Sequence, residues 1–329
     1  MAERAHPRPK LYPPPEFPPR RPARFARTPP AVFPVILGLF GLGLALRRGV
    51  AAGVPEGVGD MVLGAVAVLW VFAVLAYLAK MARRVPVVME DLRVLPGRAG
   101  LAAGTMGALA LAAAVAPLSV TVAKGVLVAG LVAHGVLMVA VLRVLLSLPP
   151  EGRGVTPVFH LTFVGFIVGG IAAPAVGWEG LAVALLWGAV PVALAIWAAS
   201  AVQLVRRVPP APLRPLLWVH LAPASLIATV AGATGTGWLA LAALVLATAI
   251  LLALLVTARW VLESGFSPMW GAMTFPLAAY GSALFANGFG LAGLVVTVVT
   301  LGVVPWVAWR VFTLWGSGRL AAVTNAAEA

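Results

Sequence analysis

The residues that could carry out acid–base, nucleophilic or metal chemistry are few in this chain and stand far apart. Its 329 residues include 10 aspartates and glutamates, 4 histidines and no cysteine. The lack of cysteine excludes disulfides, thiol catalysis and Cys-ligated metals. Neither an H-E-x-x-H zinc motif nor a G-x-x-x-x-G-K-[ST] phosphate loop occurs. We therefore expect a protein that is not an enzyme and holds no metal or other cofactor.

Three histidines, His134, His160 and His220, lie in apolar surroundings. They are too scattered along the chain to indicate a metal site. His160 and His220 each follow shortly after the start of an apolar segment, which leaves two interpretations open. They either form local hydrogen bonds near a helix end, or face a cytoplasmic vestibule and make its potential more positive when protonated.

The amino-acid composition explains why so few residues could carry out acid–base, nucleophilic or metal chemistry. Hydrophobic residues make up 62% of the chain and charged residues only 10%, whereas about 25% is usual for charged residues in soluble proteins. The solvent must therefore be a lipid bilayer. The net charge of +13 would suggest nucleic acid in a soluble protein. Here the charges lie between apolar segments, so we expect lipid contact and no nucleic-acid partner.

Ten apolar segments approach the length of about 20 residues that a spanning helix requires. They cover 31–47, 60–80, 99–119, 121–146, 157–176, 180–204, 215–235, 237–259, 268–287 and 289–314. We predict an all-α integral membrane protein with ten transmembrane helices. With the N-terminus inside, only Arg47, Arg48 and Lys124 lie on the outer side. The positive-inside rule then places both termini in the cytoplasm.

The chain divides into a membrane domain and two tails. Residues 1–30 are rich in Pro and Arg and contain no apolar run. This composition predicts a disordered cytoplasmic tail, which either only fixes the orientation or contacts anionic lipid or a partner. Residues 31–315 form the predicted transmembrane domain, and 316–329 form a short cytoplasmic C-terminal tail.

The ten segments form five similar helical hairpins. Each odd-numbered segment follows a proline-bearing turn, and most even-numbered segments end with arginine. The odd segments are also rich in Gly and carry Pro34, Pro174, Pro223 and Pro276. Irregular backbone at membrane depth is tolerated where it is buried or lines a cavity, which predicts an inner ring of odd helices around a pore. The alternative is that small residues merely allow close helix packing.

A pore of this kind would favour anions. No carboxylate lies in the middle of any segment, arginines flank the segments, and small residues and hydroxyls occupy the inner ones. Backbone N–H groups, hydroxyls and remote positive charge are partners for anions rather than cations. The predicted pore-lining residues are Pro34, Gly38, Gly41, Thr105, Gly165, Pro223, Ser225, Thr274 and Pro276.

Five stretches resemble a known family. They are FPVILGLFGLGLALR (33–47), VMEDLRVLPGRAGLAAG (88–104), TPVFHLTFVGFIVGG (156–170), LRPLLWVHLAPASL (213–226) and WGAMTFPLAAYGSA (270–283). In order and spacing they resemble the tellurite-resistance/dicarboxylate transporter family, which includes bacterial TehA-type proteins and plant slow anion channels. The resemblance implies a bacterial inner-membrane homotrimer whose five inner helices form a pore. The chain departs from the family where Leu95 precedes Pro96, a position usually held by His.

The resemblance also implies a gate. In this family a phenylalanine on the ninth helix closes the pore, and the matching residue is Phe275, followed by Pro276. From pattern alone Phe275 could equally pack between helices, and Phe40, Phe163 and Phe166 are alternatives on other inner helices. A hydrophobic constriction can close a pore by steric block and dewetting.

The sequence thus favours an anion channel or transporter that moves small anions through a central pore gated by Phe275. A secondary carrier for dicarboxylates or tellurite is the first alternative. A membrane scaffold or sensor without transport activity is the second. His160 and His220 are the predicted residues of the inner mouth.

Overall fold

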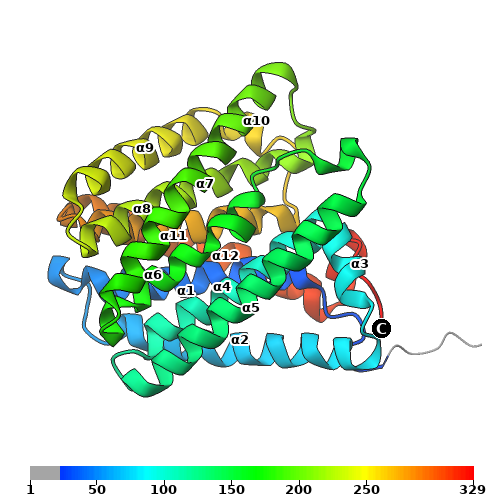
Figure 1. The fold of residues 1–329 in the computed structure, drawn as a ribbon, viewed down its shortest axis with the longest axis horizontal. Helices are drawn as coiled ribbons and strands as arrows, with labels where there is room; N and C mark the ends of the chain where they lie inside the picture. Colours follow the sequence, from blue (N-terminus) through cyan, green and yellow to red (C-terminus); the bar gives the residue numbers. More distant parts are fainter. Residues whose placement is uncertain (1–22) are drawn as a thin grey trace, which may run out of the picture.

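The computed structural model describes residues 23–329, without the side chains of Pro150 and Glu151, and this part is entirely helical (Figure 1). Eight helical stretches are long and apolar enough to cross a membrane. They contain α1 (Phe33–Arg48), α2 (Val58–Arg83), α4 (Leu95–Val115), α5 (Val120–Ser147), α7 (Glu179–Arg206), α8 (Leu221–Ala233), α9 (Gly237–Val256) and α12 (Gly290–Gly316). The 3₁₀ helices η1 (Pro30–Val32), η2 (Gly49–Ala52) and η7 (Ala211–His220) extend α1 and α8.

The other two predicted segments are less regular. The segment predicted over 157–176 contains a shorter apolar helical stretch, His160–Ala172, followed by a 3₁₀ turn, and its helix type changes along the way. The pieces of this segment are a π-helix (η4, His160–Val164), a 3₁₀ turn (η5, Gly165–Val168), α6 (Gly169–Ala172) and a second 3₁₀ turn (η6, Pro174–Val176). Three glycines and Pro174 weaken regular helix here. The ninth segment is η8 (Pro268–Trp270) followed by α11 (Gly271–Ala286).

Short helices that the sequence did not predict occupy the connections. They are α3 (Val87–Arg93), η3 (Pro150–Arg153), α10 (Ala258–Val261) and α13 (Arg319–Val323). The predicted 1–30 tail lies mostly outside the described residues, but Ala26 and Thr28 near its end are buried. In the predicted C-terminal tail, Leu320 is buried as well.

The helices form two layers. In the most apolar stretches of the α1, α4 and α8 spans, 78% to 83% of residues are buried, against 28% to 33% for α2, α5, α7, α9 and α12. The inner elements contact one another in a closed cycle, from α1 to α4, α6, α8, α11 and back to α1. Each also contacts the outer helix that follows it in the chain. The inner face of every outer helix therefore packs on the cycle, and its outer face is apolar and exposed.

Polar contacts hold the two ends of this bundle. At one end Arg47 pairs with Asp60 at 2.6 Å and donates to the carbonyls of Ala113 and Ala114, at the end of α4. These carbonyls lack helical partners, so the arginine satisfies them. The opposite end, which we call the basic end, holds the N-termini of α1 and α4 and the C-terminus of α2. Both described termini lie there, since the Ala329 N–H donates to the Ala26 carbonyl at 3.1 Å.

A buried ion pair organises the basic end. The Lys80 ammonium lies 2.8 Å from the Asp91 carboxylate, and both side chains are fully buried. Asp91 also accepts hydrogen bonds from the Tyr77 hydroxyl and the Ala327 N–H, and Lys80 donates to the Thr28 carbonyl. One carboxylate therefore joins α2, α3 and both terminal segments. The neighbouring Arg84–Glu90 pair is more exposed, and its hydrogen bonds lower the pKa of Glu90.

We expect Asp91→Asn to destabilise the protein, because it leaves the Lys80 charge buried without a counter-charge. Breaking a buried pair in this way costs about 3–5 kcal/mol. Thermal and denaturant unfolding in detergent micelles would measure the loss. Glu90→Gln, one residue away in an exposed pair, is the control and should change little. Equal melting of the two variants would contradict the organising role of Asp91.

Candidate functional site

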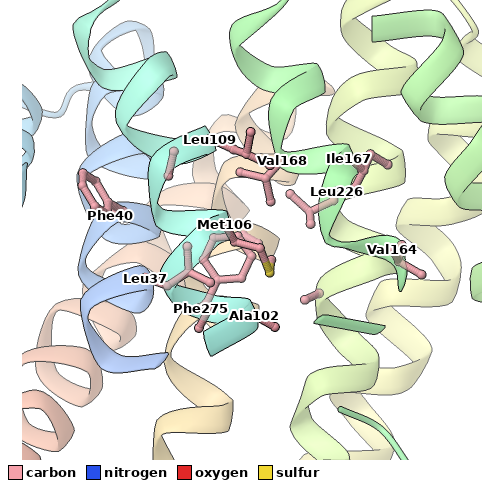
Figure 2. Packing of buried hydrophobic residues seen from close by; sticks show 14 of the residues in the cluster. Leu37, Phe40, Ala102, Met106, Leu109, Val164, Ile167, Val168, Leu226 and Phe275 are labelled. Carbon is pink, nitrogen blue, oxygen red and sulfur yellow. The ribbon is translucent and has the colours of Figure 1, made fainter. Parts of the chain in front are cut away.

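Phe275 is buried among side chains of the inner elements. It is on α11, only 4% of its surface is exposed, and its ring rests on Gly41 of α1. A Cβ atom at Gly41 would lie 3.0 Å from the Phe275 ring. Buried side chains from the other inner elements belong to the same hydrophobic cluster (Figure 2). Those labelled there include Leu37 from α1, Ala102 and Met106 from α4, Val164, Ile167 and Val168 from the fifth segment, and Leu226 from α8.

The contact between α1 and α11 is closest one turn away, at Gly38 and Thr274. A Cβ atom at Gly38 would overlap the Thr274 side chain and lie 3.1 Å from its backbone carbonyl carbon. The Thr274 hydroxyl donates to the Gly271 carbonyl at 2.8 Å and lies 3.2 Å from the Pro34 carbonyl. Gly38 and Gly41, predicted to line a pore, thus serve as contact surfaces for Thr274 and Phe275.

Thr105 and Gly165 meet around His134, on the other side of α4. The Thr105 hydroxyl lies 2.7 Å from His134 Nδ1. A Cβ atom at Gly165 would lie 2.9 Å from the His134 ring and from the Met106 sulfur. The small residue therefore lets the irregular fifth segment approach both α4 and α5. Sequence spacing gave no indication of this contact, because it joins three separate segments.

Three predicted residues shape the inner helix backbones. Pro223 lies in the first turn of α8, where proline is well tolerated. The Ser225 hydroxyl donates to the Leu221 carbonyl at 2.9 Å and is fully buried. Pro276 lies inside α11 and removes one backbone N–H directly after Phe275. A carbonyl of the preceding turn thus loses its helical partner beside the buried ring.

The rival phenylalanines have other surroundings. Phe40 is fully buried and points away from Phe275 (Figure 2). The Phe163 ring packs on Phe159 with centroids 5.4 Å apart, and the Phe166 ring lies 4.4 Å from the His134 ring. Phe275 differs from these three rings in its contact with Gly41 of α1.

His160 and His220 are brought together by the fold. His160 Nε2 lies 3.0 Å from His220 Nδ1, and both side chains are at most 9% exposed. They lie 60 positions apart, so spacing could not reveal the pair. The sequence analysis considered the histidines too scattered to indicate a metal site and did not predict this contact. In the described part of the chain no third His, Cys, Asp or Glu groups with them.

A small apolar cluster lies at the basic end of the inner elements. Ala99, Val158 and Leu216 are buried there, and Leu95, Leu161, Met269 and Ala272 pack against them. These residues stand at the N-terminal ends of α4, the fifth segment, η7 and α11. The centre of the cycle is therefore filled by apolar side chains both here and at Phe275.

We expect Gly38→Ala to destabilise the protein by about 1–3 kcal/mol, the usual cost of overpacking, because the added methyl overlaps Thr274. Gly64→Ala is the control, since nothing lies within 4 Å of a Cβ atom there. Replacing Gly64 by alanine on the exposed side of α2 should stabilise the folded protein by about 0.5–1 kcal/mol. Unfolding in micelles would compare them, and a Gly38→Ala variant as stable as Gly64→Ala would refute the close contact.

Comparison with known proteins agrees with this architecture. No curated protein matches the chain. The family model described as a voltage-dependent anion channel, SLAC1, matches residues 27–315. That range begins just before α1 and ends at the last turn of α12, so it covers all the inner and outer elements. The chain belongs to the SLAC1 family of voltage-dependent anion channels, and is a multipass membrane protein of anion transport.

Proposed function

We propose that the protein conducts small anions across a bacterial inner membrane, through a path enclosed by α1, α4, the fifth segment, α8 and α11. Phe275 closes this path. The observation that carries the proposal is the position of its buried ring, seated on Gly41 within a cycle of five inner elements. The ring is held by packing alone, so a rotation or a small shift of α11 is enough to move it.

The arrangement of charge supports anions. The described carboxylates lie in loops or in the terminal turns of helices, and the one fully buried carboxylate, Asp91, is neutralised by Lys80. Among the described residues Asp91 is the one buried carboxylate, and it lies at the basic end. A cation would therefore meet no counter-charge from the described residues near Phe275, whereas an anion gains from helix dipoles and from distant arginines.

The same distribution favours passive conduction over coupled transport. Proton-coupled carriers usually need an ionisable residue within the span. Among the described spans, His134 of α5 is buried and ionisable, and its Nδ1 is occupied by the Thr105 hydroxyl at 2.7 Å. The buried hydroxyls of Thr274, Ser225 and Thr229 each donate to a carbonyl of their own helix. None of these hydroxyls carries charge. A secondary carrier remains the alternative, and a saturable, gradient-coupled flux would favour it.

The proposed topology has ten spans, with both termini in the cytoplasm and the basic end facing inward. The meeting of the two described termini at one end supports an even number of spans. The arginines near that end agree with the positive-inside rule. The exposed apolar faces of the outer helices would contact lipid and, in a homotrimer, neighbouring copies.

We expect Phe275→Ala to raise anion flux into liposomes at least about tenfold, which corresponds to a barrier lower by about 1.4 kcal/mol. Chloride and nitrate are the ions to test. The reason is that the variant removes the ring that fills the centre of the cycle. Phe275→Leu keeps part of that volume and should give an intermediate flux.

Phe40→Ala is the matched control, because it removes the same ring from α1 on the side away from Phe275. It should lower the melting temperature but leave flux at the wild-type level. If both alanine variants conduct equally, the leak comes from loosened packing and Phe275 is no gate. If neither conducts any anion, the channel proposal fails.

A further inference from the structure

A second cavity, apart from Phe275, opens at the basic end. It has a volume of about 530 Å³ and lies between the start of α4, the loop before the fifth segment, the end of α7 and η7. Its polar lining consists of Arg98, Thr156, Ser200, Gln203, His220 and, at the exposed rim, Arg206 and Arg207. No carboxylate is among the described residues that line it.

Four of these side chains have buried atoms without a partner. Arg98 Nε and Nη1, Thr156 Oγ1, Ser200 Oγ and His220 Nε2 form no hydrogen bond in the described part of the chain. Arg98 is 8% exposed, Ser200 7% and His220 9%. A buried guanidinium without a counter-charge is costly, and it stands in the first turn of α4, where the helix dipole is already positive. An anion in the cavity would relieve both penalties.

The histidine pair can adapt to such a ligand. One of the two facing nitrogens, His160 Nε2 or His220 Nδ1, must carry the shared proton. If His160 Nε2 donates, neutral His220, which lines the cavity, carries its own proton on Nε2, a buried atom without a partner in the described chain. The cavity then presents guanidinium, imidazole and hydroxyl donors together.

The remaining lining indicates the class of anion. Apolar residues such as Leu95, Val155, Pro157, Leu213 and Leu217 face the same space. A volume of about 530 Å³ falls within the range of about 300–1,000 Å³ typical of sites for small organic molecules. The planar fork of arginine matches a carboxylate group. We propose that this cavity binds a small organic carboxylate, held by Arg98, Ser200, Thr156 and His220.

The cavity borders the proposed path. Leu95 and Leu216 line it and also belong to the apolar cluster that contacts Met269 and Ala272 at the start of α11. A carboxylate bound here would stand where the helix that carries Phe275 begins. Transport of this anion rests on the proposed function, whereas its binding to the cavity does not.

Titration of the purified full-length protein in detergent with butyrate tests the site, with thermal stabilisation as the readout. Wild type should show a saturable rise in melting temperature with butyrate that chloride and nitrate do not match. Arg98→Lys keeps the charge but loses the fork, and should weaken butyrate binding at least about tenfold. Ser200→Ala should weaken it severalfold. Arg143→Gln, an exposed arginine outside the cavity, should bind like wild type.

Arg98→Gln separates binding from a structural role. It should abolish the butyrate response without lowering the melting temperature of the ligand-free protein, because it removes an unpaired buried charge. A lower melting temperature together with an unchanged butyrate response in Ser200→Ala would overturn the proposal. Equal stabilisation of wild type by chloride or nitrate would overturn the carboxylate class.

Measurements of anion flux distinguish the proposed carboxylate site from the proposed channel. If Phe275→Ala conducts chloride and wild type binds no butyrate, the carboxylate site fails and the proposed channel stands. If butyrate binds through Arg98 and no variant conducts, the site stands and the channel fails.

Discussion

The close approach of α1 and α11 is the contact on which the rest of the structure depends. Gly38 and Gly41 have no side chains, so Thr274 and Phe275 can press against the α1 backbone. In lipid, association between helices relies on such packing, because burial from water contributes nothing there. The same two glycines therefore close the inner cycle and place the Phe275 ring inside it.

The inner elements that form the cycle are less regular helices than the outer ones. Several inner elements begin or continue as 3₁₀ or π-helix, as in η7 and the fifth segment. Such irregular backbone is tolerated because it is buried among protein neighbours, while the outer helices that face lipid are continuous α-helices. The layer exposed to lipid satisfies its own hydrogen bonds, and the buried inner layer can adopt irregular backbone.

Charge follows the same division. Acidic and basic side chains are confined to the two ends, where Arg47–Asp60 and Lys80–Asp91 hold neighbouring helices. Unlike these paired groups, Arg98 is buried at the basic end without a described partner. An unpaired cation beside an apolar cavity and an uncharged centre are both consistent with a protein that handles anions.

The sequence by itself determined the solvent, the ten apolar segments and the position of Phe275 before Pro276. It did so because a bilayer demands long apolar stretches and leaves polar residues to the ends. It did not predict the shorter, irregular helix of the fifth segment, where three glycines and Pro174 weaken regular hydrogen bonding. Only the tertiary structure decided which distant residues meet. The His160–His220 pair, the seat of Phe275 on Gly41 and the cavity around Arg98 each join separate helices, and sequence spacing carries no information about such contacts.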